Sequence, residues 1–211
     1  MNIRNIVFDF GGVIASIDFD KAVQAFKQIG LKDADRRLDK YHQTEIFQEL
    51  EEGKLTTMQF QQLLGNLCGR TLNFEETQKA WLGFITEVNL HQLRYIEELH
   101  AHYRLYLLSN TNPYIMSWAC SEAFSPEGKP LTHYLDRLYC SYQMGYTKPD
   151  ERIFQRLLED ASILPEETLF VDDGLNNIQA AQKLGMHTLH TVNGKDWCDA
   201  LSEKIRLPDR T

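Results

Sequence analysis

The chain has 211 residues, of which 43% are hydrophobic and 25% are charged, with 12 glycines and 6 prolines. This balance excludes collagen-like, disordered and low-complexity proteins, and the length suits one domain or a core domain with a smaller insert. The net charge of -8 disfavours binding to nucleic acid or to an anionic membrane.

The most apolar stretch, residues 6–17, is interrupted by Asp9, two glycines and Ser16. It falls well short of the ~18 apolar residues that a membrane span needs, and an acid within it is unlike the apolar region of a signal peptide. The four cysteines are scattered and form no CxxC pair, which predicts reduced thiols rather than a zinc site or a disulfide framework. We therefore expect a soluble, cytoplasmic protein.

Five short runs rich in β-branched and aromatic residues predict buried strands, with helices between the later ones. The strands are expected at Asn5–Phe10, Arg104–Ser109, Arg137–Ser141, Thr168–Asp172 and Thr188–Val192. The helices are expected at Tyr114–Phe124, Glu151–Ala161, Asn177–Leu184 and after Trp197. Strands that alternate with helices predict an α/β fold, in which helices cover both faces of a parallel sheet.

Residues Asp18–Asn89 differ from the rest, because they show the spacing of amphipathic helices and no convincing strand. Three glycine-containing breaks divide them, at Gly30, Gly53–Thr56 and Gly69–Asn73. The segment therefore predicts an all-helical insert after the first strand. We expect a core made of residues 1–16 and 91–211 and an insert made of residues 17–90.

Chemically active residues follow four of the predicted strands, at the edge where parallel sheets bind ligands. Asp9 ends the first strand, ahead of two glycines that let the backbone approach a ligand closely. The other three groups are Ser109–Asn112, Lys148 and the pair Asp172-Asp173. Three carboxylates at one edge repel one another unless a cation lies among them, and oxygen ligands suit Mg²⁺. A hydroxyl, helix N–H groups and a lysine suit a phosphoryl group.

The same residues, in the same order, resemble the four motifs of the haloacid dehalogenase-like (HAD) hydrolases. The matching segments are Ile6–Val13, Leu108–Asn110, Lys148–Asp150 and Phe170–Asp173, followed by Asn177. The resemblance spans residues 3–192 and implies a Rossmann-like sheet in the order 5-4-1-2-3, with the insert as a cap over the active site. The first motif and the segment Phe47–Phe60 are similar to a branch of sugar-phosphate phosphatases that includes a glucose-1-phosphate phosphatase.

The resemblance also implies a role for each residue, in a Mg²⁺-dependent phosphatase that acts on a small phosphorylated metabolite. Asp9 is the implied nucleophile, which accepts the phosphoryl group, and Lys148 links it to the phosphate by charge. The implied metal ligands are Asp9, the Gly11 carbonyl, Asp172 (directly or through water) and Asp173. The implied substrate-binding residues are Gly12, Ser109 and the N–H of Asn110.

One position departs from the HAD pattern. These phosphatases usually carry a second Asp two residues after the nucleophile, where it protonates the leaving group and then activates water, but this chain has Gly11 there. Either another group such as Asp18 or a residue of the insert moves the proton, or the preferred leaving group needs little help. Because an acid is missing at Gly11, the chain has an alternative function as a non-catalytic module that binds a phosphorylated ligand or a protein. A metal-independent dehalogenase is a further alternative.

Several charged residues of the insert lie where a loop could reach the site: His42, Glu45, Glu49, Glu51, Glu52 and Lys54. A solvated helix face explains them equally well. The three tryptophans, Trp81 among them, are expected to be packing residues.

Overall fold

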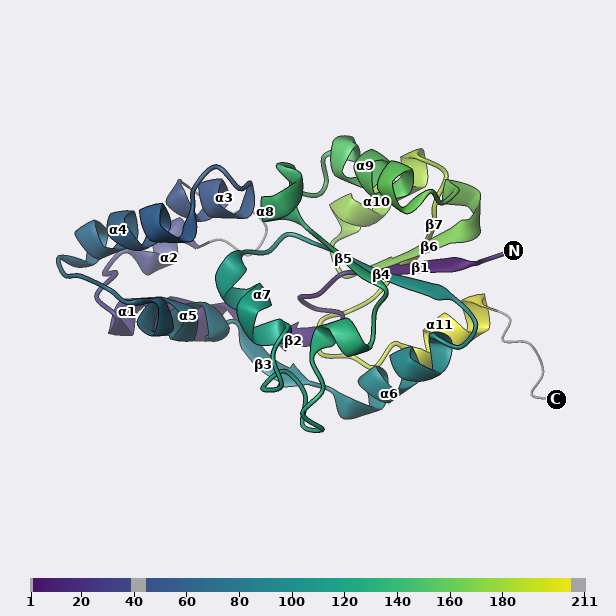
Figure 1. The fold of residues 1–211 in the computed structure, drawn as a ribbon, viewed down its shortest axis with the longest axis horizontal. Helices are drawn as coiled ribbons and strands as arrows, with labels where there is room; N and C mark the ends of the chain where they lie inside the picture. The colour runs from purple at the N-terminus through teal and green to yellow at the C-terminus, as the bar shows by residue number, and fades with distance from the viewer. Residues whose placement is uncertain (1, 39–44, 206–211) are drawn as a thin grey trace.

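The computed structural model describes residues 2–38 and 45–205, and a five-stranded parallel sheet forms its centre (Figure 1). In spatial order its strands are β5 (Arg137–Cys140), β4 (Arg104–Ser109), β1 (Asn5–Phe8), β6 (Thr168–Asp172) and β7 (His187–His190). The first strand lies in the middle, which confirms the predicted order 5-4-1-2-3. Because β1 ends at Phe8, Asp9 is the first residue beyond it.

Helices cover both faces of the sheet, as predicted. Along β1, Ile6 and Phe8 belong to one buried hydrophobic cluster and Val7 to the other, as the alternation of side chains in a strand requires. Helices α9 (Glu151–Ala161) and α10 (Leu175–Lys183) cover the face of Val7. The opposite face packs against α6 (Leu90–Leu99), α7 (Pro113–Ala119) and α11 (Cys198–Lys204). Figure 1 shows these layers above and below the sheet.

The insert lies to one side of the sheet and contains five helices in the described residues (Figure 1). They are α1 (Phe19–Gln28), α2 (Ala34–Arg37), α3 (Ile46–Glu51), α4 (Thr57–Cys68) and α5 (Phe74–Leu82). The predicted breaks are correct: α4 ends at Gly69, whose φ of 69° is left-handed, and capping boxes at Thr56 and Asn73 start α4 and α5. A buried group of aromatic rings holds four of these helices, α1, α3, α4 and α5, together: Phe26, Phe47, Phe60 and Trp81.

A two-stranded antiparallel ribbon joins the insert to the core. It consists of β2 (Ala15–Ile17) and β3 (Ile85–Val88). The expectation of no strand within residues 18–89 was therefore wrong at β3. Only four residues long and half-exposed, β3 has too little alternation to be recognised, and its pairing with β2 is a contact between distant parts of the chain.

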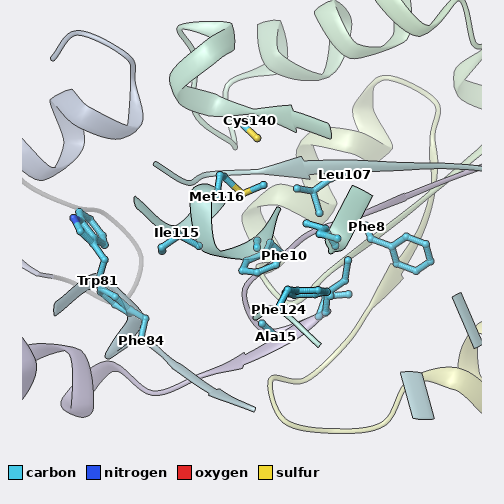
Figure 2. Close-up of a cluster of buried hydrophobic side chains, with 14 of the residues drawn as sticks. Phe8, Phe10, Ala15, Trp81, Phe84, Leu107, Ile115, Met116, Phe124 and Cys140 are labelled. Carbon is cyan, nitrogen blue, oxygen red and sulfur yellow. The ribbon is translucent and has the colours of Figure 1, made fainter. Parts of the chain in front are cut away.

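Hydrophobic packing continues from the sheet into the insert. In Figure 2 it runs from Phe8 and Leu107 through Phe10 and Ile115 to Trp81 and Phe84. The remaining short elements are a 3₁₀ turn at Leu131–His133, α8 (Ser141–Met144) and a 3₁₀ turn at Pro165–Glu167. Helix α7 ends at Ala119, earlier than predicted. Among residues 2–38 and 45–205, none of the helices has the length and apolar character of a membrane span.

Candidate active site

Three carboxylates converge beyond the ends of β1 and β6. These two strands pair in parallel, with Phe8 opposite Val171, so the next residue of each strand reaches the same edge. The Asp9 N–H continues the pairing by donating to the Val171 carbonyl at 2.9 Å. As a result, one carboxylate oxygen of each of Asp9, Asp172 and Asp173 lies within 4.8 Å of the other two.

Lys148 lies among these acids and is 3% exposed. Its Nζ is 2.8 Å from Oδ1 of Asp9 and 2.7 Å from Oδ2 of Asp172. The loop that carries Lys148 follows β5 and α8 and is held to the end of β4 by the side chain of Asn110. Lys148 is therefore a buried ammonium group shared by two carboxylates.

Asp172 is completely buried, and protein donors occupy both of its oxygens. Oδ1 accepts from the Gly174 N–H at 2.7 Å and from Nδ2 of Asn177 at 3.0 Å, while Oδ2 accepts from Lys148. Asn177, which follows the fourth of the matching segments, thus serves as a donor to Asp172. Asp9 and Asp173 line the neighbouring cavity, whereas Asp172 lies behind them.

The two glycines of the first motif have different surroundings. Gly12 has a φ of +78°, and a Cβ there would lie 2.2 Å from Oδ2 of Asp173. Gly12 is not among the described residues that line the cavity, so its backbone lies close to the Asp173 side chain rather than to the cavity. Gly11 does line the cavity, and a Cβ there would meet Ile17 at an ordinary 3.5 Å. Position 11 therefore has room for a side chain, whereas a side chain at position 12 would displace Asp173.

Burial and crowding of like charges dominate the electrostatics of the site. Burial raises the pKa of Asp9 to about 7 against the opposing charge of Lys148, with Asp172 and Asp173 adding to the rise. Burial and Asp172 also raise the pKa of Asp173. Burial acts to lower the pKa of Lys148, but Asp172 and Asp9 hold it above its ordinary value. Three ionised acids with one ammonium group leave two negative charges, which a divalent cation would balance, and the oxygen-rich donor set fits Mg²⁺.

The cavity beside these acids has a volume of about 490 Å³ and is lined by both the core and the insert. The end of β4 contributes Ser109, Asn110 and Thr111, immediately before Asn112, which caps α7 by accepting from the N–H groups of Tyr114 and Ile115. The core wall therefore joins carboxylates, a lysine and a cluster of small polar residues. This combination can bind a phosphate group and present a carboxylate to it.

The insert forms the opposite wall, which the sequence indicated only in part. Of the acids expected around Gly53, Glu51 lines the cavity. Glu45 pairs with Arg37, Glu52 pairs with Lys54, and Glu49 is exposed. His42 lies outside the described residues. Asp18, one candidate for moving the proton, instead caps α1 by accepting from the Lys21 N–H at 3.1 Å.

Aromatic side chains complete the insert wall. Trp81, expected only as a packing residue, is 1% exposed but also lines the cavity together with Phe84. Its ring packs among the other aromatic rings of the insert, as its prediction as a packing residue requires. Its Nε1 is buried with no hydrogen-bond partner among the described residues. Trp81 thus belongs both to the packing of the insert and to the site.

Known proteins show the same architecture. The family model of the haloacid dehalogenase-like hydrolases matches residues 3–185. A D-ribitol-5-phosphate phosphatase from Bacteroides thetaiotaomicron is 60% identical over 200 residues, which cover 95% of this chain and 97% of that protein. A protein from Porphyromonas gingivalis described as a predicted HAD-like family hydrolase has a solved structure with a TM-score of 0.92 and 39% identity, covering 99% of this chain and all of that one. A second HAD family enzyme from B. thetaiotaomicron, in complex with magnesium and inorganic phosphate, gives a TM-score of 0.86 at 32% identity, over 94% of this chain and 98% of that one. The chain therefore belongs to the haloacid dehalogenase-like hydrolase family.

Proposed function

We propose that this chain is a Mg²⁺-dependent phosphatase that hydrolyses the phosphate ester of a small sugar or sugar alcohol. The observation that carries this proposal is the arrangement of Asp9, Lys148 and Asp173 on one wall of a cavity large enough for such a molecule. The 60% identity with a D-ribitol-5-phosphate phosphatase supports the same activity. A five-carbon sugar alcohol 5-phosphate is accordingly the substrate class that we test first.

Asp9 is the nucleophile in this proposal. Its Oδ1 is fixed by the Phe10 N–H at 2.7 Å and by Lys148, which leaves its other oxygen to attack phosphorus. The attack transfers the phosphoryl group to Asp9, and water then hydrolyses the aspartyl-phosphate. Ser109 and the N–H of Asn110 bind the phosphate oxygens, and Lys148 balances charge between the phosphate and Asp9.

Asp9, Asp173 and the Gly11 carbonyl would hold Mg²⁺, with Asp172 contributing through water because protein donors occupy both of its oxygens. When bound, the ion supplies positive charge that stabilises the phosphate oxygens during transfer. Gly12 serves the site by leaving room for Asp173. In this proposal Gly12 contacts Asp173 and not the substrate, whereas the resemblance implied a direct contact with the substrate.

We further propose that residues 17–90 act as the cap of the enzyme, because they close the cavity opposite Asp9 with Glu51, Trp81 and Phe84. The four cysteines are free thiols, which supports a cytoplasmic location. The acidic net charge agrees with a small phosphorylated metabolite as partner rather than nucleic acid.

The test is a panel of phosphate esters assayed for phosphate release by the purified protein, with Mg²⁺ and with EDTA. D-ribitol 5-phosphate, glucose 1-phosphate, glucose 6-phosphate and p-nitrophenyl phosphate form the core of the panel. We expect Mg²⁺-dependent release and the highest kcat/KM for a sugar or sugar-alcohol phosphate. Tight binding of these esters without phosphate release would instead identify a binding module.

A further inference from the structure

The carboxyl groups that line the cavity on the described core wall are Asp9 and Asp173, which already serve as the proposed nucleophile and metal ligand. An alkoxide is a poor leaving group, so cleavage of an alkyl phosphate is much faster when an acid protonates the leaving oxygen. Position 11, from which HAD phosphatases usually supply that acid, is a glycine here, and Asp18 is engaged as a helix cap. The ester named for the 60% identical relative is that of a primary alcohol, the class that needs such an acid most.

Among the described residues of the insert, one carboxyl group lines this cavity. Glu51 is the last residue of α3 and lines the same cavity as Asp9, Gly11 and Lys148. Two residues later the chain turns against the core at Gly53, where φ is +71° and a Cβ would lie 2.1 Å from the carbonyl oxygen of Tyr142. Tyr142 is in α8, on the path from β5 to Lys148. The end of α3 is thus in direct contact with the segment that leads to the catalytic lysine.

The surroundings of Glu51 differ from those of its neighbour. Glu52 is paired with Lys54 at 2.5 Å and accepts from Gln48 at 2.8 Å, and the Lys54 contact lowers its pKa. Glu51 has no ion pair among the described residues, and burial, followed by the charges of Asp9 and Glu52, raises its pKa to about 8. Its carboxyl group therefore holds a proton at neutral pH, as a general acid must.

We propose that Glu51 is the general acid and base of this enzyme and replaces the side chain that is missing at Gly11. The inference rests on the phosphatase activity proposed above. In the first step, the bond between phosphorus and the ester oxygen breaks as Asp9 bonds to phosphorus, and the Glu51 carboxyl gives its proton to the leaving oxygen. In the second step, the Glu51 carboxylate takes a proton from water as that water attacks phosphorus. Phosphate and the Asp9 carboxylate are released, and Glu51 is protonated again.

A different role for Glu51, accepting hydrogen bonds from the hydroxyls of a sugar alcohol, makes different predictions. Aryl phosphates have no such hydroxyls, so a residue that only holds the sugar does not affect their cleavage. A residue that transfers protons does affect it, most strongly for phenols of high pKa. A series of aryl phosphates that differ in leaving-group pKa therefore separates the two roles.

The experiment compares wild type, Glu51→Gln and the matched control Glu52→Gln in single-turnover reactions with that series and Mg²⁺. Glutamine has the shape of a protonated glutamic acid, and circular dichroism verifies the fold. For wild type and Glu52→Gln we expect rates that change little with leaving-group pKa. For Glu51→Gln we expect a steep dependence, with a loss of about 10²–10⁴-fold for the poorest leaving groups. With the most activated ester, Glu51→Gln should release a burst of phenol and accumulate acid-stable phosphoenzyme, because water is no longer activated.

Parallel plots for Glu51→Gln and wild type, or a loss confined to hydroxylated esters, would overturn the role of Glu51 and leave the phosphatase activity standing. Absence of any Mg²⁺-dependent phosphate release by wild type would instead reject the proposed function itself. The two failures are thus read from different proteins in the same experiment.

Discussion

Asn110 and Lys148 hold each other through reciprocal hydrogen bonds. The Lys148 N–H donates to Oδ1 of Asn110 at 2.7 Å, and Nδ2 of Asn110 donates to the Lys148 carbonyl at 2.9 Å. A side chain at the end of β4 therefore fixes the backbone that places the Lys148 ammonium group between Asp9 and Asp172.

Asn110→Ala should weaken catalysis through the position of Lys148. It removes both hydrogen bonds, each worth about 0.5–1.5 kcal/mol, so we expect a modest loss of stability. We expect kcat to fall by a larger factor than KM rises, because Lys148 becomes mobile while Ser109 still binds phosphate. Steady-state kinetics with thermal unfolding tests this, and Asn110→Asp, which keeps only the acceptor, should fall between wild type and Asn110→Ala. Unchanged kcat in Asn110→Ala would show that Lys148 is held by other contacts.

Asp9→Asn should abolish turnover and leave a protein at least as stable as wild type. The amide keeps the shape of the side chain but is not a nucleophile, and it removes a buried charge from the neighbourhood of Asp172 and Asp173. The measurement is phosphoenzyme trapping in acid together with the melting temperature. Formation of phosphoenzyme by this variant would place the nucleophile elsewhere.

Lys148→Met should destabilise the protein by about 3–5 kcal/mol, because it leaves the buried Asp172 without its cation. Adding Asp172→Asn removes the unpaired charge, so the double variant should recover part of that loss. Denaturant unfolding of the two single variants and the double variant measures the coupling. Additive effects would contradict a direct interaction between the two side chains.

Mg²⁺ should raise the melting temperature of wild type, since an ion that binds only the folded state adds about 2.7 kcal/mol at a hundred times its Kd. Asp173→Asn should lose this response. Gly12→Ala should lose it too, because the added Cβ would displace Asp173, whereas Gly11→Ala has room and should retain it. An equal response in Gly12→Ala and Gly11→Ala would be inconsistent with the contact between Gly12 and Asp173.

Glu51 should make stability fall as pH rises. Its pKa is about 8 in the folded protein and 4.5 for the ordinary side chain, so between these values the folded state retains a proton that the unfolded chain has lost. The stabilising effect is complete below about pH 4.5 and is lost by about pH 8. The melting temperature of Glu51→Gln should therefore rise relative to that of wild type across this range. Glu52→Gln keeps the Glu51 carboxyl group and loses one of the charges that raise its pKa, so its melting temperature should change much less relative to wild type. A constant difference for both variants would show that Glu51 is ionised in the folded protein.

The sequence predicted the sheet and the core wall of the site because their signals are local. Asp9 comes directly after β1, and Ser109 and Asp172 end β4 and β6. Parallel pairing then brings these strand ends together, as for Asp9 and Asp172. The insert wall was harder to predict, because adjacent acids such as Glu51 and Glu52 look alike in a sequence. Which of them faces the cavity depends on the contact of Gly53 with Tyr142, some ninety residues away in the chain. Trp81 was recognised as a core residue for its size, but its place on the cavity wall likewise depends on how the insert lies against the sheet.

The β2–β3 ribbon has a consequence for how this enzyme can diverge. The chain enters and leaves the insert through two adjacent strands. A different insert could therefore replace this one during evolution without a change in the central sheet. In this chain the insert contributes Glu51, Trp81 and Phe84 to the cavity wall. Exchange would therefore replace the proton-transfer group together with the surface that surrounds the substrate, so that selectivity and chemistry are inherited as one unit.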